Sequence, residues 1–160
     1  MAKKKPYQYL DDLEKLEKQW RKLSGLHNRK EWSAVVIRAA TAAEIAANLA
    51  IRDEFGSRSE FDTEFVNSLL VWANGLQGKV IRLLKPLYKK GSPKAKELKS
   101  LITVMERINS KRNAVAHAGE FCNGDEADAV VEDCRTFVEG LVGLYRHDFK
   151  LKEHKFESTD

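Results

Sequence analysis

Residues 110–119 bring together three side chains that handle protons and phosphates. Arg112 and Asn113 are followed by three apolar residues and then by His117. An imidazole moves protons near neutral pH, a guanidinium holds a phosphate through paired hydrogen bonds, and an amide can orient either group. Cleavage of RNA without a metal ion needs little more than these groups. Arg112, Asn113 and His117 are therefore the candidate catalytic residues.

Positive charge is concentrated just before this segment. Residues 79–112 contain 11 lysines and arginines but 2 acidic residues, a net charge of +9, whereas the whole 160-residue chain carries +4. A polyanion drawn to this stretch would arrive beside Arg112. The alternative is a solvated helix face with its lysines turned outward. Charge by itself does not decide between the two.

Hydrophobic periodicity predicts that helices carry nearly the whole chain. A first helix is expected to end at Ser24-Gly25. A second runs from about residue 30 to residue 55, and its stripe of alanines predicts a place at the centre of a bundle, because small side chains let other backbones come close. Gly75 and Gly78 predict a break, since a glycine costs about 1 kcal/mol inside a helix. A further helix then reaches about residue 90, and Pro86 ends or bends it.

The candidate residues lie on the helix before the last. Ser92-Pro93 is a start signal, with serine as the cap and proline in the first turn, and Gly119 closes this helix. A final helix begins at Asn123 or Asp125 and reaches about residue 145, after which residues 147–160 form a charged tail. No stretch shows the sustained alternation of a strand. The predicted fold is all-α, an up-and-down bundle of four to five main helices in a single domain.

The cysteines and the long apolar run argue against a disulfide-rich, a zinc-binding or a membrane-spanning protein. Cys122 and Cys134 are too few and too far apart for a disulfide scaffold or a zinc site, so we expect two free thiols and no metal or cofactor. The apolar run at residues 34–51 contains Arg38 and Glu44, and no signal-peptide pattern follows the basic N-terminus. We therefore expect a cytoplasmic protein that does not span a membrane.

Together these features carry a family resemblance. Arg112-Asn113, three residues, His117 and then Ala118-Gly119, followed by a final amphipathic helix, resemble the R-x(4 to 6)-H motif of the HEPN superfamily. The resemblance covers about residues 30–145. Many HEPN domains are ribonucleases of toxin, phage-defence or RNA-processing systems. It implies a dimeric endoribonuclease acting on single-stranded RNA, of a kind often held in check by a separate antitoxin, such as a nucleotidyltransferase-like protein.

Helix geometry indicates what the motif offers and what it lacks. At 100° per residue Asn113 and His117 share a face, whereas Arg112 lies about 140° from His117 and must bend back to reach it. Attack by the ribose 2′-hydroxyl benefits from a base on one side of the phosphorus and an acid on the other, but one chain offers a single motif histidine. A twofold dimer would supply both.

In this mechanism the motif residues have separate roles. His117 takes the proton of the 2′-hydroxyl, and Arg112 neutralises the charge that builds on the phosphate. Asn113 holds His117 or the phosphate in place, and His117 of the partner subunit protonates the departing 5′-oxygen. The products would be a 2′,3′-cyclic phosphate and a 5′-hydroxyl.

Several alternatives stay open. His117 could instead cap its helix while Arg112 pairs with an acidic residue in the core. Glu44, a carboxylate among alanines, needs a partner if it is buried. It could support the site by orienting Arg112, form a structural ion pair, or face solvent. The whole domain could also be non-catalytic and bind a nucleotide or a partner protein.

Overall fold

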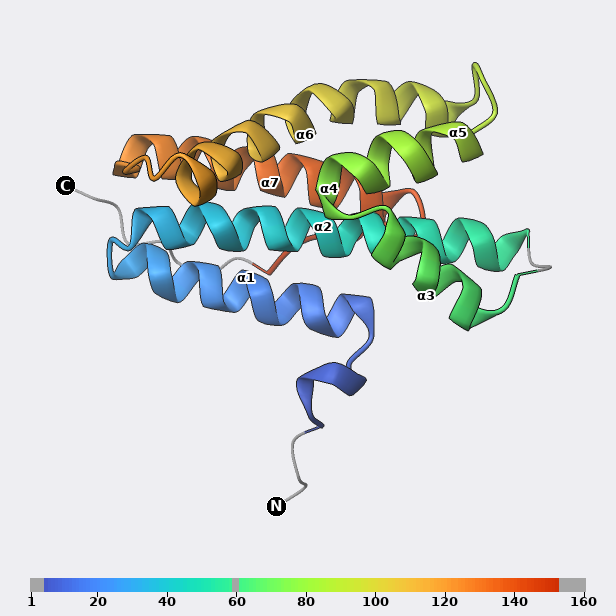
Figure 1. Ribbon diagram of the computed structural model, residues 1–160, viewed down its shortest axis with the longest axis horizontal. Helices are drawn as coiled ribbons and strands as arrows, with labels where there is room; N and C mark the ends of the chain where they lie inside the picture. Colours follow the sequence, from blue (N-terminus) through green and yellow to red (C-terminus); the bar gives the residue numbers. More distant parts are fainter. Residues whose placement is uncertain (1–4, 59–60, 153–160) are drawn as a thin grey trace.

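The computed structural model describes residues 5–58 and 61–152, and each regular element in these ranges is a helix (Figure 1). Four long helices build the bundle, and each runs opposite to the one before it: α1 (Asp12–Asn28), α2 (Trp32–Ser57), α6 (Pro93–His117) and α7 (Gly124–Gly143). The shorter elements are η1 (Tyr7–Tyr9), α3 (Thr63–Trp72), α4 (Gly75–Gln77), η2 (Gly78–Leu84) and α5 (Lys85–Leu87). The predicted all-α bundle is confirmed for the described residues, which contain no strand.

Helix α2 lies at the centre of the bundle, as its alanine stripe predicted. It contacts α1, α6 and α7 along its length, and α3, α4 and η2 on another side. Six of its alanines are completely buried: Ala39, Ala42, Ala43, Ala46, Ala47 and Ala50. By length and a mean hydropathy of 1.6, α2 could cross a membrane, but 67% of that window is buried inside the bundle. Its apolar faces are therefore used for helix packing.

Local signals set the start and the end of the helix that carries the motif. The hydroxyl of Ser92 accepts a hydrogen bond from the backbone N–H of Ala95 at 3.2 Å, and Pro93 occupies the first turn. At the other end Gly119 adopts a φ of +67°, which lets the N–H of Glu120 reach the carbonyl of Ala114 at 3.2 Å. Both predicted boundaries are confirmed.

The predicted end of the first helix at Ser24-Gly25 is wrong. Helix α1 continues to Asn28, and the Ser24 hydroxyl donates to the carbonyl of Trp20, one turn earlier, at 3.0 Å. The extra turn buries His27, whose Nε2 lies 2.5 Å from Oδ1 of Asp128 on α7. A glycine costs only about 1 kcal/mol inside a helix, and the tertiary contacts of this turn offset that cost.

The predicted break in the middle segment exists, but it lies just before Gly75 and not at Gly78. The chain leaves the helical conformation at Ala73 and Asn74, between α3 and α4, but continues through Gly78 without interruption. From there η2 is a wider, π-helical stretch in which the N–H of Lys85 bonds to the carbonyl of Val80. This widening directly precedes Pro86, which lacks an N–H and crowds the carbonyl one turn back in an α-helix. The proline thus changes the type of helix before the segment ends at Leu87.

The charged tail predicted for residues 147–160 is wrong in its first part. Leu151 is 4% exposed, and its N–H donates to Glu139 on α7 at 3.0 Å. The carbonyl of Lys152 accepts a hydrogen bond from the indole of Trp20 on α1 at 3.1 Å. The chain therefore packs back across the bundle as far as residue 152, while residues 153–160 lie outside the described residues.

Candidate functional site

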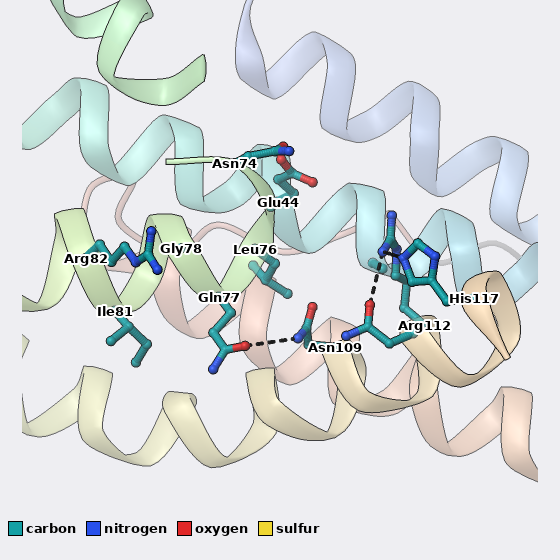
Figure 2. A pocket seen from close by; sticks show the side chains of 13 residues that line it. Glu44, Asn74, Leu76, Gln77, Gly78, Ile81, Arg82, Asn109, Arg112 and His117 are labelled. Atoms are coloured by element: carbon teal, nitrogen blue, oxygen red, sulfur yellow. Dashed lines mark hydrogen bonds between the residues drawn. The ribbon is translucent and has the colours of Figure 1, made fainter. Parts of the chain in front are cut away.

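A pocket of about 620 Å³ lies between α2, the segment from Asn74 to Arg82, and the C-terminal half of α6 (Figure 2). The four residues singled out by the sequence all line it: Glu44 from α2, and Arg112, Asn113 and His117 from α6. We call it the motif pocket. The tertiary fold thus brings a residue of the central helix to a motif that lies far away in the sequence.

Within the motif pocket, Arg112 bends back towards His117. Its Nη1 donates to Nε2 of His117 at 2.9 Å and to Oδ1 of Asn113 at 3.0 Å. The long side chain thus spans the 140° that separates the two positions on the helix, and the three motif residues form one connected group. The alternative in which Arg112 pairs with an acidic core residue is wrong, and the His117 ring contacts this guanidinium rather than a helix carbonyl.

The hydrogen bond from Arg112 defines the chemistry of the histidine. A ring nitrogen that accepts a hydrogen bond carries no proton, so Nε2 is the basic atom of His117 and Nδ1 carries the hydrogen. As long as Arg112 donates to it, the lone pair of Nε2 is occupied. An anion that engaged the guanidinium would free this nitrogen to accept a proton. The pair can therefore couple the binding of a phosphate to the release of a base.

Glu44 lines the pocket but does not contact Arg112. Its Oε1 accepts a hydrogen bond from Nζ of Lys79 at 2.5 Å. The lysine is buried, whereas the carboxylate side chain is 34% exposed. Of the roles considered for Glu44, the structure has the ion pair, with Lys79 as the partner. Lys79 balances the negative charge of Glu44. The positive charges of Arg82 and Arg112 are therefore not cancelled by this carboxylate and can attract an anionic ligand.

The pocket also contains a second arginine that sequence reasoning missed. Arg82, on η2, lies at the opposite end of the pocket from Arg112, with Glu44 and Asn74 between them (Figure 2). In the described part of the chain Arg82 has no hydrogen bond or ion pair of its own. Arg82 and Arg112 are too far apart in the sequence for helical spacing to relate them. The only signal in the sequence for Arg82 as a site residue is that it belongs to the basic stretch.

Most of the basic stretch does not reach the pocket. Of its residues, Arg82 and Arg112 line the pocket directly. Four others do not line the pocket and are held in ion pairs: Lys79 with Glu44, Lys94 with Glu54, Arg107 with Asp133, and Lys111 with Glu126. In the last pair the hydrogen bond raises the pKa of Lys111 and lowers that of Glu126. Much of the charge that looked available for a polyanion is therefore neutralised within the protein.

Amide side chains make up much of the remaining wall. Asn74 and Gln77 come from the segment around α4, and Asn109 from α6. The amide of Asn109 donates to Gln77 across the two elements at 3.4 Å (Figure 2). Amides offer both donors and acceptors, as do the edges of nucleobases. The wall thus has the chemistry to contact a base beside the phosphate-binding arginines.

The cysteines lie apart from this pocket. Cys134 is buried on α7 and donates to the carbonyl of Ala39 at 3.1 Å, and burial raises the pKa of its thiol to about 12. Cys122 is half-buried, and burial likewise raises the pKa of its thiol. Both are free, as expected. Among residues 5–58 and 61–152, no three His, Cys, Asp or Glu side chains gather closely enough to hold a metal ion.

Comparison of the chain with protein-family models, with curated proteins and with solved structures finds no match. The family resemblance therefore depends on the Arg112-Asn113-x3-His117 motif, on its place at the end of α6, and on the pocket in which the motif lies.

Proposed function

We propose that this protein is a HEPN-type endoribonuclease, of the toxin or phage-defence kind, that cleaves single-stranded RNA without a metal ion. The observation that carries the proposal is the 2.9 Å hydrogen bond between Nη1 of Arg112 and Nε2 of His117 in an open pocket. A phosphate-binding group and a proton-accepting group are thereby within reach of one phosphodiester. Arg82 adds a second guanidinium at the far end of the same pocket.

Cleavage begins when a phosphate of the RNA enters the motif pocket. Arg112 turns from the imidazole to the nonbridging oxygens of the phosphate, where a two-pronged contact is stronger than its bond to a neutral nitrogen. His117 Nε2 then takes the proton of the 2′-hydroxyl. The 2′-oxygen forms a bond to phosphorus, and the bond from phosphorus to the 5′-oxygen breaks, leaving a 2′,3′-cyclic phosphate and a 5′-hydroxyl.

The leaving 5′-oxygen needs a proton, which the proposal draws from a second subunit. A twofold dimer with its motif pockets facing each other would bring His117 of the partner subunit to that oxygen, and in its protonated, imidazolium form this histidine would supply the proton. An exposed aromatic side chain supports a contact here, because Phe121, four residues after His117, is 96% exposed. A second copy docked at this end of α6 would cover that apolar surface.

Incubation of the purified protein with single-stranded RNA in EDTA tests the reaction. We expect RNA to be cut to cyclic-phosphate ends and DNA of the same sequence to be spared, because DNA lacks the 2′-hydroxyl. His117→Ala should lower the rate by about 10²- to 10⁴-fold, as expected for loss of a general base. His147→Ala is the matched control, since that histidine is exposed and lies outside the pocket. Unchanged cleavage by His117→Ala would contradict the mechanism.

Sedimentation of Phe121→Ser tests the dimer. We expect this variant to dissociate at concentrations where the wild-type protein is dimeric, and to lose cleavage in parallel. Tyr9→Ser is the control, because Tyr9 is also an exposed aromatic residue but lies on η1, away from α6 (Figure 1). A wild-type monomer that cleaves RNA at full rate would show that the composite site is not needed.

A second candidate function is binding without catalysis, of a nucleotide or a partner protein. It is favoured by the amide-rich wall and by the fact that Arg112 already occupies the basic nitrogen of His117. Two variants, His117→Ala and Arg112→Ala, separate the candidates. A protein that only binds would leave RNA intact and would keep its affinity in His117→Ala while losing it in Arg112→Ala.

A further inference from the structure

One side of the central helix carries a row of partly exposed polar residues. Five polar residues on α2 follow each other at spacings of three and four, and all are partly exposed: Arg38, Thr41, Glu44, Asn48 and Arg52. At 100° per residue they fall within about 120° of the helix circumference, and from first to last they span about 21 Å. We call this set the α2 stripe.

Three hollows lie along the α2 stripe in the order of its residues. Arg38 lines a hollow of about 470 Å³ between α1 and α2, which we call the basic hollow. Glu44 lines the motif pocket. Asn48 and Arg52 line a third hollow of about 580 Å³, which we call the amide hollow. Asn74 lines both the motif pocket and the amide hollow, so these two adjoin.

The basic hollow has the chemistry of a phosphate site. Four cationic side chains line it, with no carboxylate among the lining residues: Arg21, Lys22, Arg29 and Arg38. Arg29 pairs with Glu31, and Arg38 donates to the amide of Gln19 at 2.9 Å. Arg21 and Lys22 have no ion pair or side-chain hydrogen bond within the described part of the chain. Two cations are thus available to an anion at one end of the α2 stripe.

The amide hollow offers hydrogen bonds rather than charge. Arg52 is neutralised there by Asp12, which it contacts through Nη1 at 2.7 Å. Asn48, Asn67 and Asn74 supply the neutral polar lining, and Lys79, which also lines the hollow, is paired with Glu44. Oδ1 of Asn48 is buried and has no hydrogen-bond partner among the described residues, which is unusual for a buried acceptor. Asn48 lines the hollow and is partly exposed, so a turn of its amide would present this acceptor to a donor on a ligand, such as the exocyclic amino group of a base.

We propose that the α2 stripe is a track for single-stranded RNA that continues on both sides of the motif pocket. The basic hollow holds backbone phosphates on one flank through Arg21 and Lys22, and the amide hollow receives a base on the other flank, where Asn48 accepts a hydrogen bond from it. The track rests on the proposed function, because the scissile phosphate lies at Arg112 and His117. It adds to that function two flanking sites that hold the strand without reacting with it.

Binding of a fluorescent 2′-O-methyl RNA oligonucleotide to the full chain tests the track separately from cleavage. The methyl group blocks 2′-hydroxyl attack, so the oligonucleotide stays intact. Arg21→Ala/Lys22→Ala should raise the Kd about tenfold or more and lower the slope of log Kd against log salt by about 1.4, the value for two phosphate contacts on a single strand. Lys89→Ala/Lys90→Ala removes the same charge from two exposed lysines after α5 and should change the Kd less than twofold.

Asn48→Ala tests the amide hollow in the same assay. Its Kd should rise about three- to tenfold with an unchanged salt slope, because a neutral hydrogen bond is lost rather than a phosphate contact. The reference is Asn28→Ala, which removes an exposed amide that lines none of the three hollows.

The outcomes separate the track from the proposed function. Equal weakening by the two double variants, or no binding of RNA by the wild-type protein, would overturn the track. If the basic hollow governs binding but unmodified RNA is never cut, the α2 stripe remains an RNA-binding surface and the ribonuclease proposal fails. If RNA is cut but Arg21→Ala/Lys22→Ala binds RNA as its control does, the ribonuclease proposal stands and the track fails.

Discussion

Two glutamates on the same helix show how differently this protein uses a carboxylate. Glu44 and Glu54 both lie on α2, and each has a lysine Nζ at 2.5 Å from its carboxylate, Lys79 and Lys94 respectively. Glu54 is 3% exposed, whereas Glu44 is one-third exposed and lines the motif pocket. The same pair of residue types therefore occurs once inside the bundle and once at the edge of a candidate site.

The cluster around Glu54 is closed, because its hydrogen bonds come from within the bundle. Besides Lys94, its carboxylate accepts from the Tyr145 hydroxyl at 2.9 Å and from Nε of Arg58 at 3.2 Å. Tyr145 in turn contacts the hydroxyl of Tyr88. Burial alone would raise the pKa of Glu54, but the hydrogen bonds from Lys94 and Tyr145 and the charge of Lys94 hold it below its ordinary value. The cluster links α2 to the start of α6 and to the end of α7.

The motif pocket is open by comparison. Arg82 has no partner in the described part of the chain, and Arg112 donates to two neutral groups, Asn113 and His117. A polar cluster whose donors and acceptors are all used inside the protein stabilises the fold, whereas one with free charge at a pocket can serve a ligand. This contrast distinguishes a structural role from a functional one more clearly than residue type does.

Among the variants that compare the two clusters, the largest expected effect is on activity, from Arg112→Ala. Loss of the guanidinium that neutralises the phosphate should lower RNA cleavage by about 10²- to 10³-fold, while the free energy of unfolding changes by no more than about 0.5 kcal/mol, since the residue bonds only to neutral groups at a pocket. Arg112→Lys should recover part of the rate, because it keeps the charge but not the two-pronged geometry. Cleavage rates and urea unfolding measure both effects, and a large loss of stability would place Arg112 with the structural cluster instead.

For Glu54→Gln we expect a loss of stability with little change in activity. Loss of the charge in a closed cluster should lower the free energy of unfolding by about 2 kcal/mol, because hydrogen bonds to a charged group are weakened where little water can replace them. Cleavage by the folded protein should persist. Glu106→Gln, an exposed glutamate of α6, provides the comparison and should unfold like the wild-type protein. Equal stability of the two variants would mean that the Glu54 cluster contributes nothing to the fold.

Acid should remove the contribution of Glu54 in a defined range of pH. Its pKa is lower in the folded protein than in the unfolded chain, where a glutamate titrates near about 4.3. The stabilisation is therefore fully present above that value and is lost as the pH falls through the lower, folded pKa. Urea unfolding at a series of acidic pH values should show a steeper loss for wild-type protein than for Glu54→Gln. Parallel curves would contradict the assignment.

The smallest expected effect concerns the pair of Lys79 and Glu44. Lys79→Met should leave the Glu44 carboxylate unbalanced at the pocket and slow cleavage roughly fivefold, about 1 kcal/mol of repulsion against the phosphate. Adding Glu44→Gln to this variant should restore the rate, because the repelling charge is gone. Failure of the double variant to recover would show that Lys79 acts on the site in some other way.

Local signals in the sequence were sufficient for much of the fold. The start of α6 at Ser92-Pro93 and its end before Gly119 were both predicted, because a cap, a proline and a left-handed glycine act within one turn. The same type of signal failed at Ser24-Gly25 and at Gly78. In these places contacts from other helices, or the demands of a nearby proline, outweighed a cost of about 1 kcal/mol per glycine. Local chemistry therefore predicts a boundary only where no tertiary contact opposes it.

For the candidate site, the sequence by itself determined the motif and the reach of its arginine, since Arg112, Asn113 and His117 lie within six residues of one helix. Only the tertiary structure decided that Glu44 pairs with Lys79 and that Arg82 lines the same pocket. The same is true of the basic hollow between α1 and α2. The physical reason is that spacing along a helix sets which side chains share a face. Which charges meet between helices depends on how the whole core packs.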